Sequence, residues 1–301
     1  MIISKCPLRI SLVGGSTDLQ AYLDKYDKGS VITFNPNIYT YIILKSSSTK
    51  YYRIVYSSID ICLEPDEIKN DIAREVIKYF NLPPIEVIFT SDISSTGSGL
   101  ASSSSYLISM INAALLFKNQ KLSKYELAKL ALQIEHTFNP LAGYQDIYGC
   151  VFNGFKKLDF DKNGLSNISY YDTSLFSYCD MHLIHTEETR SSTNILALLN
   201  IDKIHNLMDS VKNLDNYIET NQLHLIFQEI NNGWELKKLT SPKIVNDAIL
   251  NLENKLINVL AKRLIGAGAG GYFLVIVEKG KKVKYNSIPI TLGNSFEIIK
   301  F

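Results

Sequence analysis

The stretch that decides the fold runs from Ile85 to Phe117 and reads IEVIFTSDISSTGSGLASSSSYLISMINAALLF. Its first residues are β-branched and aromatic, which favours a strand. A Ser/Gly-rich loop follows directly, and the apolar run YLISMINAALLF after it suits a buried helix better than a strand. The sequence therefore predicts a strand, a glycine-rich loop and a helix, in that order.

This loop is a candidate phosphate-binding site. Gly97 and Gly99 allow backbone N–H groups to turn toward a ligand, and the N-terminus of the following helix adds a partial positive charge. The loop is not a Walker A sequence, because no Lys follows its last glycine in the required frame. A Gly/Ser-rich stretch taken alone is more often a flexible linker. Its position between a strand and a buried helix favours the phosphate interpretation here.

The rest of the chain mixes strands and helices. The first 60 residues are β-rich, a helix is predicted from Asp66 to Phe80, and Ser123 with Glu126 forms a capping-box signature that opens another helix. In the second half we expect a strand at MHLIHT, the glycine-rich IGAGAGG before a strand YFLVIV, and helices over about 192 to 220, 222 to 238 and 243 to 263.

This mixed order predicts an α+β fold rather than a doubly wound sheet. A turn-rich stretch near residues 161 to 167 is the best candidate for a border between two lobes. We therefore expect an N-terminal domain over residues 1–165 and a C-terminal domain over residues 166–301.

Composition limits the possible partners. The chain has 301 residues, 46% of them hydrophobic, and a formal net charge of +1, so it can bury a large core but has no global field for nucleic acid or anionic membranes. The four cysteines lie far apart and suggest a reducing compartment. The first residues lack a signal-peptide pattern, and no run of eighteen apolar residues occurs. We expect a cytoplasmic protein without a membrane partner.

Two carboxylates follow the predicted phosphate loop. Glu135 has Ala128, Ala131 and Leu132 on its own face of a predicted helix, which indicates a buried carboxylate that needs a cation such as Mg²⁺. Asp146 lies in AGYQDIYG, which predicts a loop in which a carboxylate could take the proton of a substrate hydroxyl. Taken alone, each has an ordinary explanation: a Glu that reaches solvent and an Asp that forms a turn.

The glycines of IGAGAGG permit close approach of the main chain either to a ligand or to another loop. We count Gly268 and Gly270 as candidate substrate-binding residues on the first alternative. A dinucleotide-binding loop is a poor alternative, because these glycines precede a strand instead of opening a helix after one.

Taken together, CPLRISLVGGSTDL near the start, TGSGLASSSS near residue 100 and IGAGAGG near residue 266 resemble the three motifs of the GHMP kinase superfamily. The further segments ELAKLALQIEH, GYQDIYG, TEETRSSTNIL and NNGWELKKL are similar to its D-glycero-D-manno-heptose 7-phosphate kinase branch. The resemblance covers nearly the whole chain. It implies a two-lobed α+β kinase that uses ATP and Mg²⁺, with the active site in the cleft between the lobes.

The resemblance also implies roles for individual residues. Ser103 and Glu135 would hold Mg²⁺, Asp146 is at the position of the catalytic aspartate, and Arg9 is where relatives keep a Lys or Arg beside the transferred phosphoryl group. Asp146 would either orient the attacking hydroxyl or deprotonate it. The residues that would wrap the ATP phosphates are Gly97, Ser98, Gly99, Leu100, Ala101, Ser102, Ser103 and Ser104.

For the substrate, the resemblance implies a small sugar that already carries a phosphate at C7 and receives a second at C1. Asp18, with Thr17 beside it, would contact sugar hydroxyls. Arg190 is the candidate for the resident phosphate, because a guanidinium offers a bidentate fork to phosphate oxygens. Lys237 and Lys238 are weaker candidates for the same role.

Several positions depart from the family pattern. Ser95 and Ala101 stand where the second motif commonly has Pro and Gly, Ser16 replaces a glycine of the first motif, and Ile147 follows the catalytic aspartate where relatives often have Gln. If position 101 needs a positive φ, Ala101 would cost stability or reshape the phosphate loop.

Two other functions remain compatible with the sequence. One is a kinase of the same superfamily that acts on an unphosphorylated sugar or on a mevalonate-like or homoserine-like alcohol. The other is a regulator that binds sugar and ATP without turnover. Retention of Arg9, Ser103, Glu135 and Asp146 together argues against the regulator, because a binding module needs no proton acceptor and metal pair.

Overall fold

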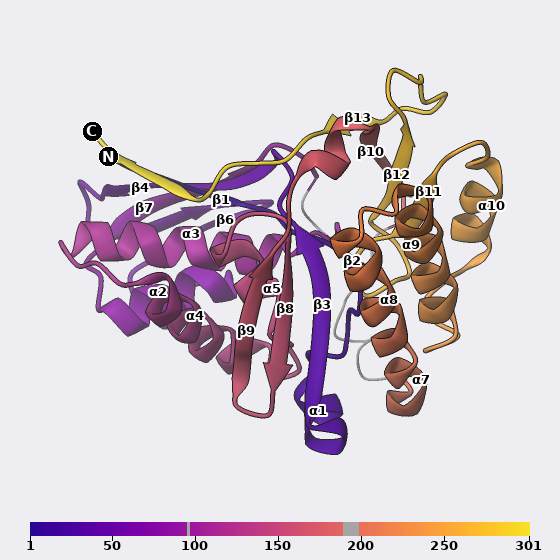
Figure 1. Ribbon diagram of the computed structural model, residues 1–301. Helices are drawn as coiled ribbons and strands as arrows, with labels where there is room; N and C mark the ends of the chain where they lie inside the picture. Colours follow the sequence, from indigo (N-terminus) through magenta and orange to yellow (C-terminus); the bar gives the residue numbers. More distant parts are fainter. Residues whose placement is uncertain (95–96, 189–198) are drawn as a thin grey trace.

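The computed structural model describes residues 1–94, 97–188 and 199–301 (Figure 1). At its centre, the glycine-rich loop joins strand β7 (Ile85–Ser91) to helix α3 (Ser102–Phe117), as the sequence predicts. The apolar residues of α3 lie all around its axis, so the helix is stable only inside the core. Ser105 fixes it to the neighbouring sheet, since its hydroxyl donates to the Cys6 carbonyl (3.0 Å) and bonds with the Thr40 hydroxyl (2.7 Å).

The first sheet has six strands in the order β14-β1-β4-β7-β5-β6, and helices α2 (Asp71–Phe80), α3 and α4 (Lys124–Phe138) lie on one of its faces (Figure 1). The last strand of the chain pairs with the first, so the two termini lie side by side. A short 3₁₀ turn, Pro65–Glu67, precedes α2. The other strands of this sheet are β1 (Ile2–Pro7), β4 (Tyr39–Ser46), β5 (Tyr52–Val55), β6 (Ile59–Cys62) and β14 (Glu297–Lys300).

The second sheet, β2-β3-β8-β9, lies in the middle of the molecule and is antiparallel throughout (Figure 1). Two short helices flank it: α1 (Gln20–Tyr26) enters β3, and α5 (Gln145–Val151) precedes β8. These helices matter for the site because its polar residues lie just before α1 and in the first turn of α5. The strands are β2 (Ile10–Val13), β3 (Lys28–Phe34), β8 (Lys156–Asp161) and β9 (Gly164–Tyr170).

The third sheet, β11-β12-β10-β13, is packed against the helices of the second half of the chain (Figure 1). Trp234 of α9 is buried there, and its indole N–H donates to Glu253 (2.9 Å) of α10. The elements are η2 (Ser174–Ser177), β10 (Cys179–His185), α7 (Ile201–His205), α8 (Leu207–Glu219), α9 (Leu223–Lys238), α10 (Asp247–Lys255), β11 (Ala261–Leu264), β12 (Tyr272–Glu278) and β13 (Ile288–Ile290).

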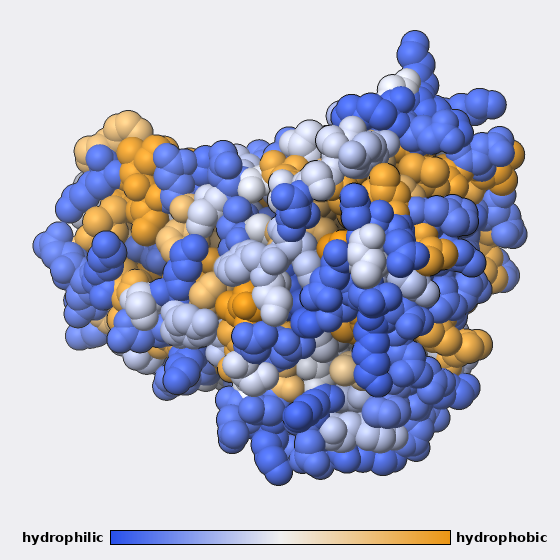
Figure 2. Space-filling view, viewed as in Figure 1, coloured by the Kyte–Doolittle hydropathy of each residue, from blue (hydrophilic) through white to orange (hydrophobic). Residues whose placement is uncertain are grey.

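The predicted α+β class is confirmed, because strands and helices alternate irregularly around three mainly antiparallel sheets. The predicted domain border after residue 165 falls within β9, and the division into 1–165 and 166–301 stays a prediction. The hydrophilic residues cover most of the face seen in Figure 2, and apolar residues form separate patches on it. Among the described helices, none combines the length and apolar character that crossing a bilayer requires.

Three local predictions were wrong. Residues 145–151 form helix α5 instead of a loop, because Ile147, Tyr148, Cys150 and Val151 are buried and tertiary packing overrides the weak helix propensity of the flanking glycines. The helix expected around 243–263 ends at Lys255, and residues 261–264 pair with β12. The part of the helix expected over 192–220 that the structure describes divides into α7 and α8 at Asn206.

Candidate active site

A cavity of about 330 Å³ opens between the phosphate loop, the segment after β2 and the loop before β12. Its volume lies within the range of small-molecule sites. Most of its wall comes from the first half of the chain, and Lys237, Gly266 and Ala267 close it from the second half. The cavity thus has the position predicted for the active site, at the meeting of the two halves.

Three residues of the loop before α3 have a left-handed backbone conformation. Gly97 and Gly99 have φ angles of 64° and 80°, and Ala101 has a φ of 62°, which L-residues rarely adopt. The Ser98 hydroxyl accepts from the Leu100 N–H (3.2 Å) and bonds with the Ser102 hydroxyl (2.8 Å). The predicted phosphate residues that line the cavity are Gly97, Ser98, Gly99, Ala101, Ser102 and Ser103; Leu100 and Ser104 lie behind them.

A second glycine-rich loop supports the first by direct main-chain contact. A Cβ at Gly99 would lie 2.3 Å from the Ile265 carbonyl oxygen, and a Cβ at Gly271 would lie 2.4 Å from the Ser98 carbonyl oxygen. The glycines of IGAGAGG therefore approach another loop, which was the second alternative from the sequence. Of this loop, Gly266 and Ala267 line the cavity rather than Gly268 and Gly270, whose contact with substrate stays a prediction.

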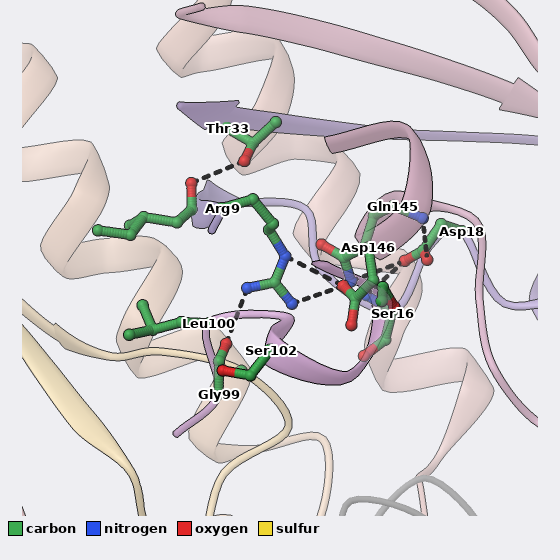
Figure 3. Close-up of polar contacts among 12 residues, drawn as sticks. Arg9, Ser16, Asp18, Thr33, Gly99, Leu100, Ser102, Gln145 and Asp146 are labelled. Atoms are coloured by element: carbon green, nitrogen blue, oxygen red, sulfur yellow. Dashed lines mark hydrogen bonds and ion pairs between the residues drawn. The ribbon is translucent and has the colours of Figure 1, made fainter. Parts of the chain in front are cut away.

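Arg9 and Asp146 form the central ion pair of the cavity (Figure 3). The Arg9 guanidinium donates from Nε (3.0 Å) and Nη2 (2.5 Å) to Oδ1 of Asp146, and from Nη1 to the Gly99 carbonyl oxygen (2.8 Å). The Arg9 side chain is 4% exposed and that of Asp146 37%. Within the described part of the chain, Oδ2 of Asp146 receives no hydrogen bond, so this oxygen can accept one from a bound hydroxyl.

Glu135 lies on the cavity wall and is buried, as its helical neighbours predict. The Ser104 hydroxyl donates to both of its carboxylate oxygens (3.0 and 3.3 Å). Burial, together with the negative charge of Asp146, raises the pKa of Glu135 to about 8. Among the described residues, no Lys or Arg side chain forms an ion pair with it, so its negative form calls for a cation from outside the protein.

A magnesium ion fits this wall. In the described part of the chain no three His, Cys, Asp or Glu side chains gather as metal ligands, and Mg²⁺ commonly takes one or two carboxylates and completes its shell with phosphates and water. Ser103 is exposed in the first turn of α3 and lines the same cavity as Glu135. Ser103 and Glu135 can therefore hold a metal together with nucleotide phosphates, and their role as ligands stays a prediction.

The other predicted substrate residues have different surroundings. Thr17 is fully buried, and its hydroxyl lies within hydrogen-bond distance of the carbonyl oxygens of Gly14 (2.8 Å) and Ser30 (2.9 Å), to either of which it can donate; it does not line the cavity. Asp18 lines the cavity, yet its oxygens already accept three N–H groups of the protein. Burial raises the pKa of Asp18 to about 6. Arg190 lies outside the described residues.

Lys237 and Gln145 line the cavity, although the sequence contains little or no indication of a role for them. Lys237, in the last turn of α9, reaches the cavity and its Nζ donates to the Gly266 carbonyl oxygen, whereas Lys238 points to Glu235 and Glu253. Gln145 bonds to Asp18 and also lines the cavity. A sequence signal existed only for Lys237, which belongs to the segment NNGWELKKL.

Transfer of a phosphoryl group to a hydroxyl needs donors for phosphate oxygens, positive charge and an acceptor for the hydroxyl proton. The cavity brings groups of these kinds together, an arrangement that suits the transfer of a phosphoryl group. Residues 68–154 match the GHMP kinases N terminal domain.

Similarity to known proteins extends along the chain. It is 28% identical to D-glycero-alpha-D-manno-heptose 7-phosphate kinase of Campylobacter jejuni, over 95% of this chain and 92% of that protein. The crystal structure of a D-glycero-D-manno-heptose 1-phosphate kinase from Bacteroides thetaiotaomicron has a TM-score of 0.79 at 20% identity and covers 100% of this chain and 99% of its own. Mevalonate kinase of Methanococcus jannaschii has a TM-score of 0.73 at 19% identity, with 98% of both chains covered. This chain therefore shares the fold of these two structures over at least 98% of its length.

Replacing Ala101 with glycine should stabilise the protein. The positive φ of Ala101 costs about 1–2 kcal/mol, and part of the gain is offset by the greater freedom of glycine in the unfolded chain. We expect the free energy of unfolding to rise by about 0.5–1 kcal/mol, measured by urea denaturation. Ala248→Gly in the exposed first turn of α10 is the control and should lower it. A loss of stability in Ala101→Gly would show that no strain is stored at this position.

The raised pKa of Glu135 predicts that the metal-free protein loses stability as the pH rises. Between its ordinary value of 4.5 and its folded value of about 8, the folded state holds a proton that the unfolded state has released. Since one pKa unit corresponds to about 1.4 kcal/mol, the loss from pH 5 to 8 is on the order of 4 kcal/mol or less. Chemical denaturation in EDTA at a series of pH values measures it.

Glu135→Gln is the control for this pH dependence, because it keeps an oxygen that can accept from Ser104 and removes the titration. Its stability should change much less over the same range. An identical pH dependence in the wild type and in Glu135→Gln would contradict the assignment to Glu135.

Proposed function

We propose that this protein is an ATP-dependent sugar kinase that phosphorylates the C1 hydroxyl of D-glycero-D-manno-heptose 7-phosphate to give the 1,7-bisphosphate. The observation that carries the proposal is the Asp146 carboxylate, which Arg9 holds by one oxygen only, at the mouth of the phosphate loop. Similarity over nearly the full chain to a heptose 7-phosphate kinase supports this choice of sugar.

In this reaction the sugar hydroxyl oxygen forms a bond to the γ-phosphorus of ATP, and the bond from that phosphorus to the bridging β–γ oxygen breaks. The products are ADP and the sugar bisphosphate, and the hydroxyl loses its proton. The loop from Gly97 to Ser104, with the N-terminus of α3, would bind the ATP phosphates through backbone N–H groups.

Oδ2 of Asp146 would accept a hydrogen bond from the attacking hydroxyl, and Asp146 would either orient that hydroxyl or accept its proton. Arg9 fixes the carboxylate at Oδ1, and its guanidinium joins Asp146 to the Gly99 carbonyl, so the acceptor and the phosphate loop keep a set separation. Charge that develops on the transferred phosphoryl group would lie close to this guanidinium, where it is stabilised.

Ser103 and Glu135 would hold Mg²⁺, which supplies positive charge to the nucleotide phosphates. The resident phosphate of the substrate needs a cation of its own, because Asp18, Glu135 and Asp146 give the cavity three carboxylates. Arg190 remains the candidate from the sequence, and Lys237 is a second one, since it lines the cavity and its Nζ contacts Gly266, another residue of the cavity wall.

Asp146→Asn should abolish turnover and leave ATP binding intact, because the amide cannot take a proton but keeps the shape of the side chain. The assay is Mg²⁺-dependent ADP release with D-glycero-D-manno-heptose 7-phosphate, mannose, galactose and mevalonate offered in parallel. We expect wild-type turnover on the heptose phosphate alone and a loss of at least about 100-fold in the variant. Turnover on an unphosphorylated compound alone would refute the proposed substrate, and ATP binding without any turnover would favour the regulator.

Lys237→Met should raise the KM for the sugar phosphate at least about tenfold, because it removes a cation from the cavity wall. Lys238→Met is the matched control: it removes the same charge one residue away, where the lysine pairs with Glu235 and Glu253. Steady-state kinetics at saturating ATP separate the two. If both variants keep the wild-type KM for the sugar phosphate and for ATP, Lys237 binds no phosphate.

A further inference from the structure

We propose that Asp18 is a positioning residue for Asp146: its carboxylate caps the first turn of α5 and so sets where the Asp146 side chain stands in the cavity. This inference rests on the proposed function, since it assigns the catalytic role to Asp146. It gives Asp18 a different role from the contact with sugar hydroxyls that the family resemblance implies.

Both carboxylate oxygens of Asp18 accept hydrogen bonds from N–H groups of the protein (Figure 3). Oδ2 accepts from the backbone N–H of Gln145 (2.9 Å), and Oδ1 accepts from the side-chain Nε2 of Gln145 (3.0 Å) and from the backbone N–H of Ser16 (3.1 Å). Asp18 is only 1% exposed. Three N–H donors thus occupy a carboxylate that has about four acceptor positions.

Helix α5 depends on this cap. The first N–H groups of any helix lack partners within it, and the N-cap residue of α5, Tyr144, has no side-chain bond to them. Asp18 satisfies the first of these groups from a distant part of the chain, and a carboxylate there also interacts favourably with the helix dipole. The backbone N–H of Tyr144 adds a contact of 3.4 Å to the Asp18 carbonyl oxygen.

The neighbouring backbone is shaped to admit this carboxylate. A Cβ at Gly143 would lie 2.2 Å from Oδ2 of Asp18, so any larger residue there would push the cap away. Glycine is therefore needed at position 143 for a steric reason that does not depend on its φ angle. It allows the segment after β2 to contact the start of the helix directly.

Asp146 is the residue after Gln145, so the cap and the ion pair hold it from two sides. Arg9 holds the side chain at Oδ1, and Asp18 holds the backbone of the turn from which that side chain projects. The ion pair with Arg9 and the contact of Asp18 with the backbone together fix the position of Oδ2 of Asp146. Loss of the cap would let the turn shift while the ion pair remains, and a misplacement of about 1 Å can lower the rate of a reaction about 100-fold.

The test uses Asp18→Asn, Gln145→Glu and the double variant in the full-length protein. The asparagine turns one acceptor into a donor that faces the Gln145 side chain or its backbone N–H. In the double variant the amide and the carboxylate of this pair are exchanged, so their mutual hydrogen bond can form again at the same net charge. Kinetics are measured on whichever sugar the wild type phosphorylates, with thermal unfolding as a check on folding.

If Asp18 positions Asp146, Asp18→Asn lowers kcat about 100-fold and leaves the sugar KM within about twofold of the wild-type value. The kcat of the double variant is then about tenfold higher than that of Asp18→Asn. If Asp18 instead binds sugar hydroxyls, its variant raises the sugar KM with kcat retained and the exchange gives no recovery, which would overturn the proposal.

Hydrogen exchange of the peptide that spans residues 145–151 gives a readout that does not depend on catalysis. We expect faster exchange in Asp18→Asn than in the wild type, and unchanged exchange would overturn the proposal even if the wild type turned over no sugar. Gln145→Met is a second variant, for the case that Asp18→Asn fails to fold. It removes only the side-chain donor and keeps the capped backbone N–H. It should lower kcat less than Asp18→Asn and leave the exchange of α5 near wild type.

Discussion

The guanidinium of Arg9 is the group on which the site depends. Arg9 belongs to the two-residue link from β1 to β2, and its guanidinium is nearly fully buried, where it joins the phosphate loop at Gly99 to the first turn of α5 at Asp146. The groups that would bind the donor phosphates and the acceptor hydroxyl therefore share one rigid anchor. A buried arginine without these partners would be costly, so the ion pair also fixes how α5 and the loop pack on the sheets.

The carboxyl groups of the cavity influence one another through their negative charge. Asp146 raises the pKa of both Glu135 and Asp18, after the larger effect of burial, so its negative charge opposes ionisation of these two carboxyl groups. A divalent cation and the phosphate donors of the loop would relieve this conflict when nucleotide binds. The supporting contacts have the same purpose: Ser104 orients Glu135, the capping contacts of Asp18 orient α5, and the second glycine-rich loop supports the first through its main chain.

The sequence predicts the parts of this site that local pattern controls. The order of strand, glycine loop and buried helix around residue 100 is confirmed, and so is the burial of Glu135, because its helical neighbours are small and apolar. Helix α5 was missed because both its buried packing and its contact with Asp18, 127 residues away, are tertiary interactions. Strand β11 was missed because its pairing with β12 decides its structure. The reach of Lys237 into the cavity depends on a loop 29 residues further on, which no local pattern indicates.

The most direct test of the central claim, that this cavity is a phosphoryl-transfer centre built on Arg9 and Asp146, is a crystal structure with Mg²⁺ and a non-hydrolysable ATP analogue. We predict nucleotide phosphates against the loop from Gly97 to Ser104, a metal at Glu135 and Ser103, and the terminal phosphate facing Oδ2 of Asp146. Nucleotide bound with its phosphates elsewhere, or Glu135 left without a metal while the phosphates are in place, would contradict it.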